Sequence, residues 1–66
     1  MMFEVLRVDA TEFKKNVGDK VKKGEIIGYL KNTPVVVNVG GIIQCIYFDE
    51  DTHELEVVIL AEKVKE

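Results

Sequence analysis

A chain of 66 residues predicts one domain, residues 1–66, because so short a chain buries only about 60% of its unfolded surface. Hydrophobic residues make up 47% and charged residues 32%, a balance that indicates a folded globular protein. The net charge of −3 argues against nucleic acid as the main partner, since backbone binding needs a cationic surface. The thin core also leaves little room for a deep catalytic cleft.

Cysteine usage and apolar run length indicate the compartment. Cys45 is the single cysteine, so an intrachain disulfide is excluded and a reducing compartment fits best. The longest apolar runs, such as Val57–Ala61, are far too short to span a bilayer. The start of the chain, Met1–Val5, lacks the basic and long apolar stretches of a secretory signal. The expectation is a cytoplasmic protein with no membrane partner.

The first segment, Phe3–Val8, alternates as a strand does, with Phe3 and Val5 on one face and Leu6 on the other. Asp9–Glu12 follows as a turn. No segment longer than about ten residues repeats its apolar residues with the helical period of 3.6. The sequence therefore predicts an essentially all-β protein.

The segment Val17–Leu30 contains two expected bends followed by a strand. Gly18 and Asp19 form a turn signal, because glycine reaches positive φ without steric cost and aspartate bonds to its own backbone. Gly24 makes the next bend, and Ile26–Leu30 is the strand that follows. The predicted object is a chain that kinks twice within about eight residues, as expected in a small, tightly folded β-structure.

The next expected strand is Val35–Val39, which begins after Pro34, where a missing N–H does least harm. Gly40 and Gly41 then bend the chain. The paired glycines are interpreted as the place where strands cross closely in a small barrel. The alternative is that they leave the backbone bare for a partner strand.

A C-terminal hairpin is the clearest predicted element, with strands Ile42–Phe48 and Leu55–Ala61 joined by an acidic turn. A four-residue loop over 49–52 would set Phe48 opposite His53, Ile46 opposite Leu55, Gln44 opposite Val57 and Ile42 opposite Ile59. One face would then be mostly apolar, with Glu54 and Glu56 on the other. The tail 63–66 is polar and expected to fray.

Val17–Leu30 resembles the hammerhead half-motif of biotinyl/lipoyl-like domains, and Pro34–Ile43 resembles the entry to their second half. The resemblance runs over Val5–Ala61, although the second half has Asp49–Asp51 where the family has a Gly-Asp turn. It implies a barrel-sandwich hybrid of about seven or eight short strands.

The same resemblance draws attention to Lys31, because carrier members attach biotin or lipoate to a lysine at a hairpin tip between the two halves. Methionine or aspartate commonly flanks that lysine, and neither flanks Lys31. The interval from Leu30 to Gly40 is also short for a protruding hairpin, and Pro34 stiffens it. The chain therefore resembles members without the acceptor lysine and without a cofactor. The alternative is a carrier domain modified at Lys31.

Cys45 and His53 are the only candidates for a nucleophile and its base. In the predicted hairpin they lie about 10 Å apart, beyond the hydrogen-bond reach that such a pair needs. We interpret Cys45 as a strand residue on the less buried face and His53 as a rim residue beside Phe48. Asp49–His53 could offer cation ligands but lacks the glycine of a calcium loop, so a solvated turn is expected. No catalytic or metal site is predicted.

The function hypothesis is therefore a non-catalytic module for protein–protein docking, a scaffold or accessory subunit of a larger enzyme complex. Lys20, Lys22 and Lys23 form a cationic cluster that could contact an acidic partner, together with the Gly40–Gly41 bend. The alternative is that these lysines are solvated and protect a sheet edge. Because a dimer interface adds buried area to a thin core, a homo-oligomer is also expected.

Overall fold

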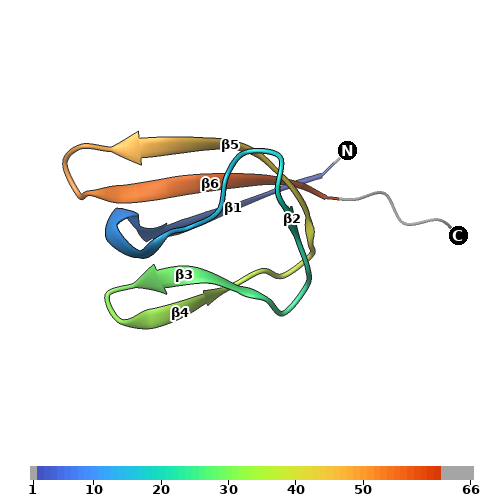
Figure 1. The fold of residues 1–66 in the computed structure, drawn as a ribbon, viewed down its shortest axis with the longest axis horizontal. Helices are drawn as coiled ribbons and strands as arrows, with labels where there is room; N and C mark the ends of the chain where they lie inside the picture. The colour runs from blue at the N-terminus through green and yellow to red at the C-terminus, as the bar shows by residue number, and fades with distance from the viewer. Residues whose placement is uncertain (1, 62–66) are drawn as a thin grey trace, which may run out of the picture.

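The structure is a computed structural model that describes residues 2–61. Over this range the chain has strands, turns and one 3-10 turn (Ala10–Glu12), but no α-helix (Figure 1). The six strands are β1 (Phe3–Asp9), β2 (Lys20–Val21), β3 (Ile26–Leu30), β4 (Thr33–Val36), β5 (Gly41–Asp49) and β6 (Glu54–Ala61). The all-β prediction is confirmed, but the predicted strand number is too high for the described residues. The predicted frayed tail, 63–66, lies outside them.

Two antiparallel sheets form the fold. The larger has the strand order β1-β6-β5-β2, and the smaller is the hairpin β3-β4. The larger sheet curls into a half-barrel, and the hairpin lies beside β1 across its open side (Figure 1). Gly28 of β3 permits this approach, because a Cβ there would lie 2.9 Å from the Cγ1 of Val8 in β1. The sheet and the hairpin therefore enclose one core.

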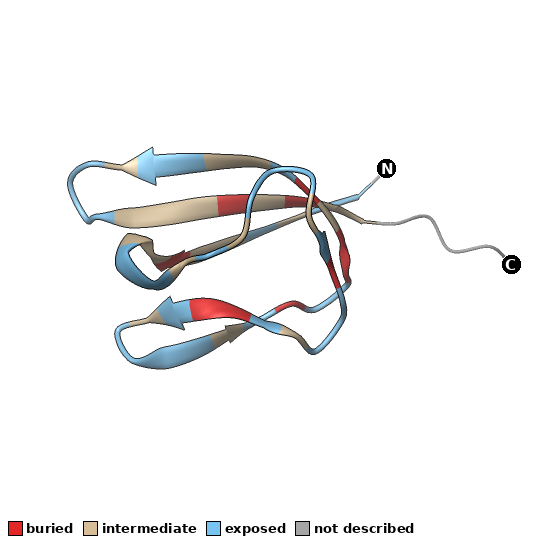
Figure 2. Ribbon diagram, in the orientation of Figure 1, coloured by how far each residue is buried: buried red, intermediate tan, exposed pale blue. Residues whose placement is uncertain are grey.

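The core is thin: every strand except β4 gives it one or two buried hydrophobic residues, and one more comes from the connection after β4 (Figure 2). Its buried members are Val8, Val21, Ile27, Val37, Ile43, Val57 and Ile59. Leu6 and Leu55 are partly buried and pack against it. Alternation along β1 and β6 explains which of their residues are buried, since every second residue of a strand points to the same side of the sheet.

The predicted strand Val35–Val39 is wrong at its end, because β4 stops at Val36. Val37 is buried and turns away from the hairpin: its N–H donates to the Glu25 carbonyl at 2.9 Å. Its own carbonyl accepts the Gly24 N–H at 2.7 Å. The bend around Gly24 therefore takes the hydrogen bonds that a longer β4 would have given to β3.

The residues after Val37 are held by one side chain of β1. The Glu4 carboxylate accepts the backbone N–H groups of Asn38 at 3.0 Å and Val39 at 3.1 Å. These donors would otherwise lack partners at the end of the strand, and a carboxylate satisfies both at once. Glu4 thus ties the connection between β4 and β5 to the edge of the large sheet.

The β5–β6 hairpin exists as predicted, but the predicted register is wrong. Phe48 pairs with Leu55 and Asp49 with Glu54, so the loop is residues 50–53. His53 adopts a positive φ of 60° and donates its N–H to the Asp49 carbonyl at 2.8 Å, which closes the turn one residue later than expected. A bulge between Ile43 and Cys45 then moves Ile43, rather than Ile42, to the core face.

Gly40 and Gly41 are both buried, and the chain itself covers them. Gly41 pairs with Val21 on one side and with Ala61 on the other. A Cβ at Gly41 would overlap the carbonyl of Leu60 in β6. This is the close crossing of strands that the paired glycines predict, and it leaves no bare backbone at Gly41 for a partner strand.

Candidate functional site

The outer face of the large sheet, the side away from the core, is the candidate functional site. Paired residues of antiparallel strands share a face, so the register assigns its members. They form four rungs across β1, β6 and β5: Phe3–Leu60–Ile42, Val5–Val58–Cys45, Arg7–Glu56–Tyr47 and Asp9–Glu54–Asp49. No described element covers this face, so two apolar rungs and two polar rungs lie next to each other in the open.

The first two rungs form what we call the apolar patch: Phe3, Val5, Ile42, Val58 and Leu60. Phe3 is 51% exposed and Val5 is 55% exposed. An antiparallel sheet with one face in water normally carries polar residues on that face. Contiguous aliphatic and aromatic side chains on that face are typical of a binding surface, because covering them with a partner removes apolar area from water.

The polar end of the outer face is an ion cluster centred on Arg7. The guanidinium donates to Asp49 at 2.9 Å, Glu54 at 2.8 Å and Glu56 at 2.9 Å, so one cation meets three carboxylates. Arg7 holds the pKa of Asp49 below its usual value, and the N–H groups of Asp51 and Thr52 act in the same direction. The same contacts, led by Glu54, raise the pKa of Arg7.

Cys45 and Tyr47 lie between the two ends. The Cys45 thiol donates to the Tyr47 hydroxyl at 3.4 Å. This hydrogen bond is the main reason that the pKa of Tyr47 is raised, and the nearby carboxylate of Glu56 adds to it in the same direction. Cys45 is part-exposed on the outer face, as expected from the sequence.

His53 lies in the turn beyond Asp49, away from Cys45 along the strand. Its ring meets Phe48 edge-on, with 6.0 Å between ring centroids, so the predicted contact with Phe48 is confirmed. Asp49 uses its other carboxylate oxygen to accept the N–H groups of Asp51 and Thr52. Within residues 2–61, no group of three or more His, Cys, Asp or Glu side chains is arranged to hold a metal ion.

Lys31 lies where the sequence does not predict it. Lys31 and Asn32 are the two central residues of the β3–β4 hairpin, with φ of 52° and 67°. Positive φ at both positions indicates a type I′ turn, a conformation that asparagine favours. Lys31 is exposed at the tip, and its backbone N–H donates to Asp9 at 3.2 Å. The expectation that Lys31 lacks a hairpin tip is therefore wrong, and Asn32 was the signal for it.

The three lysines of the predicted cationic cluster lie together at the other end of the molecule. Lys20 is on β2, and Lys22 and Lys23 occupy the exposed turn that follows it. Gly24 completes this turn with φ of 88°. The N–H of Lys22 is the main cause of a lowered pKa at Glu25, and the ammonium of Lys15 adds to it from 3.0 Å.

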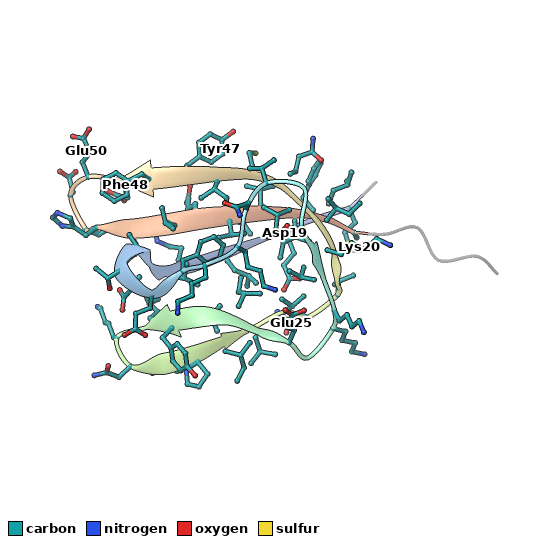
Figure 3. The ribbon with its side chains drawn as sticks, in the orientation of Figure 1. Asp19, Lys20, Glu25, Tyr47, Phe48 and Glu50 are labelled. Carbon is teal, nitrogen blue, oxygen red and sulfur yellow. The ribbon has the colours of Figure 1, made fainter. Side chains whose placement is uncertain are left out.

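A second turn precedes β2 and aligns it with β5. Gly18 has φ of 97°, and Asp19 accepts the Asn16 N–H at 2.8 Å. Figure 3 shows Lys20 near one end of the large sheet and Glu50, in the acidic turn, at the other. The lysine cluster and the acidic turn therefore lie at opposite ends of the large sheet, with the apolar patch between them.

Comparison of the chain with known protein families, with curated proteins and with solved structures gave no match. Within residues 2–61, no helix is long and apolar enough to cross a membrane. The functional interpretation therefore depends on the geometry of the outer face and of the Lys31 hairpin.

Proposed function

We propose that this protein is a non-catalytic docking module, a scaffold or accessory subunit of a larger protein complex, whose partner packs on the apolar patch. The observation that carries the proposal is that Phe3 and Val5 stand half-exposed beside Val58 and Leu60 on a sheet face that no described element covers. Covering such side chains stabilises a complex by roughly 25 cal/mol for each Å² of apolar surface removed from water.

The ion cluster favours one orientation of the partner on the docking surface. Arg7 is balanced by more carboxylates than it can neutralise, so the polar end of the outer face has a negative excess. A partner with apolar residues over Val5 and a basic residue toward Glu56 fits this arrangement. In the opposite orientation the apolar residues of the partner would cover the charged side chains of the ion cluster. Electrostatic complementarity of this kind selects the orientation of a partner more than it adds affinity.

The lysine turn supports a second, separate contact. Lys22 and Lys23 are exposed and closely follow Lys20, which lies at the opposite end of the large sheet from the acidic turn (Figure 3), and there they would meet an acidic part of the same complex. The net charge of −3 supports a protein rather than a nucleic-acid partner. A reducing, cytoplasmic setting agrees with the single free thiol of Cys45.

We also propose that the fold is a barrel-sandwich hybrid of the biotinyl/lipoyl-like type. Two features support this: the curled sheet closed by the β3–β4 hairpin, and the two kinks at Gly18 and Gly24 that lead into β3. A structural neighbour with the same order of strands would test it directly. The proposal does not require a cofactor.

A carrier function is the second candidate, and one observation favours it. Lys31 is the exposed central residue of a tight hairpin turn, the position from which a lysine can enter the active site of a modifying enzyme. The side chain would carry biotin or lipoate as an amide on its Nζ atom. The flanking residues Leu30 and Asn32 differ from those of carriers, which is why docking remains the first candidate.

Cross-linking inside the cell tests the docking proposal. A photoreactive amino acid is placed at Val5, on the outer face, and at Val36 as a matched control, since Val36 is a 41% exposed residue on the hairpin. Docking predicts a discrete cross-linked partner from Val5 and none from Val36. Equal cross-linking from both positions, or none from Val5, would contradict it.

The carrier candidate is tested by the intact mass of the protein purified from the cells that naturally produce it. An added mass equal to that of biotin or lipoate, absent from a Lys31→Arg variant, would establish the carrier. An unmodified mass would remove this candidate. The hairpin geometry is unaffected by the substitution, because arginine and lysine have similar backbone preferences.

A further inference from the structure

The free edge of β5 is a second feature that the proposed function does not use. β5 is the longest strand, yet β2 pairs only with its first two residues, Gly41 and Ile42. Ile43 adds two bonds: its N–H donates to Asp19 and its carbonyl accepts from Gly18, both at 2.9 Å. Beyond that point β5 is the boundary of the large sheet (Figure 1). Residues 44–49 therefore form a strand edge without a neighbour in the described chain.

The backbone of this edge has a definite polarity. The Asp49 carbonyl accepts the His53 N–H, so the backbone groups of Asp49 face β6. Peptide groups alternate in direction along a strand, so those of Tyr47 also face β6 while those of Ile46 and Phe48 face outward. The bulge after Ile43 resets the alternation in agreement with this assignment. Ile46 and Phe48 thus each present one N–H and one carbonyl group at the free edge, four backbone groups in all.

The side chains at this edge are unprotected as well. Tyr47 is 57% exposed on the outer face and Phe48 is 53% exposed on the inner face. Natural sheets guard their edges with lysine, proline or a covering segment, and residues 44–48 contain no such residue. The opposite edge is guarded: β1 carries Glu4, and β3 lies beside it.

We propose that a second copy of this chain pairs with the β5 edge, antiparallel and centred on Tyr47. The two outward-facing residues lie one on each side of Tyr47, so a two-fold axis there sets Ile46 opposite Phe48 of the other copy, and Phe48 opposite Ile46. These are hydrogen-bonded pairs, and they use all four outward groups of each edge. The edge is therefore complementary to itself, which is what an isologous interface requires.

Side-chain packing agrees with this arrangement. The two Tyr47 rings would lie side by side at the axis, where opposed Cα atoms are about 4.5 Å apart. Each Phe48 would cover Ile46 of the other copy and lose its exposure. The pairing ends at Asp49, beyond which the turn over 50–53 leads each chain away from the β2 of the other copy.

Charge selects the antiparallel direction. In a parallel pair, the Asp49 and Glu50 side chains of both copies would lie next to each other, which is destabilising. In the antiparallel pair Asp49 lies opposite Cys45, and the two acidic turns are at opposite ends. The dimer would join two large sheets into one, with both apolar patches on the same side. A docking module of this kind would have two equivalent binding faces.

Amide hydrogen exchange on the unmodified chain tests the pairing at single residues. As the protein concentration is raised, the amides of Ile46 and Phe48 are expected to slow at least about tenfold in parallel with dimer formation measured by ultracentrifugation. The amides of Tyr47 and Asp49, which face β6, should not change with dimer formation. A chain that stays monomeric at every accessible concentration, or a dimer in which Ile46 and Phe48 still exchange fast, would overturn the proposal.

A matched pair of variants separates this edge from the apolar patch. Phe48→Lys places a charge in the centre of the edge, and Phe3→Lys makes the same change at an equally exposed residue of the outer face. Edge pairing predicts that Phe48→Lys is monomeric and that Phe3→Lys still dimerises. The reverse pattern would place the dimer interface on the outer face and overturn the edge. Loss of partner cross-linking at Val5 would contradict the docking function and leave the edge dimer unaffected.

Discussion

The two faces of the large sheet use the same strands for different purposes. The inner face carries Val57 and Ile59, which have no exposure and belong to the core cluster together with Ile27 of β3. The outer face carries Val58 and Leu60, chemically almost the same residues, with no described layer over them. Hydrophobicity alone therefore does not separate the core from the surface in this protein. The difference is the presence of a second layer, and the outer face is the one that lacks it.

This contrast separates the residues that build the core from those that we propose for binding. Inner residues are needed to close a thin core, so substitutions there cost stability. Outer residues already meet water, so substitutions there should leave the fold intact and change binding instead. Substitutions on the two faces test that separation.

The largest effect is expected from the inner face. Ile59→Ala deletes a fully buried side chain and should lower the free energy of unfolding by about 2–5 kcal/mol, because the core cannot collapse around the cavity. Val58→Ala, on the adjacent outer position, is the control and should cost less than about 1 kcal/mol. Urea denaturation of both variants measures the difference. Equal losses would show that the two faces are not separate.

A smaller effect is expected from the ion cluster. Arg7→Met removes the cation that three carboxylates share, and should lower the urea midpoint at neutral pH by less than Ile59→Ala does. Some loss is expected because the remaining carboxylates then repel one another. Added salt should reduce the difference between the two proteins, since screening weakens both the attraction and the repulsion. A midpoint that falls as far as in Ile59→Ala would mean that this cluster holds the fold.

The same variant changes the response to acid. The folded-state pKa of Asp49 is depressed, so its contribution is present above the ordinary aspartate value of about 3.9 and is lost as the pH falls through the lower folded value. The wild type should therefore lose stability steeply below about pH 4. The Arg7→Met variant should lose less stability on acidification. The loss that remains would come from Glu25, whose pKa is also lowered. Identical acid profiles would contradict this account of Asp49.

The smallest effect on stability is expected at the patch itself. Phe3→Ser removes an apolar side chain that is 51% exposed and should change the free energy of unfolding by less than about 1 kcal/mol. Thermal or urea unfolding at matched concentration checks this. A loss as large as that of Ile59→Ala would place Phe3 in the core and remove it from the docking surface.

The sequence predicts the strands well where alternation is undisturbed. β1 and β3 lie within a residue of the predicted ranges, and the separation of Leu6 from Phe3 and Val5 onto opposite faces is confirmed. The register of β5 and β6 was not predictable in the same way. It depends on a bulge after Ile43 and on a positive φ at His53, and neither leaves a distinctive residue in the sequence.

The candidate site was predictable only in part. The hairpin pattern predicts one mostly apolar face with Glu54 and Glu56 on the other, yet the second face also carries Val58 and Leu60. The sequence does not say that one side stays open, because that depends on where the hairpin packs. The tip position of Lys31 does not follow from the short interval between Leu30 and Gly40; Asn32, which favours a two-residue turn, is the residue that indicates it.

The most direct test of the docking claim compares recovery of interacting proteins from the cells that naturally produce this chain. The double variant Phe3→Ser/Val5→Ser alters the apolar patch, and Tyr29→Ser/Val36→Ser alters exposed residues of the hairpin as a control. We expect a partner to be recovered equally with the wild type and the control, and at least about tenfold less with the patch variant, at unchanged urea midpoints. Equal recovery of that partner with the patch variant would contradict the account.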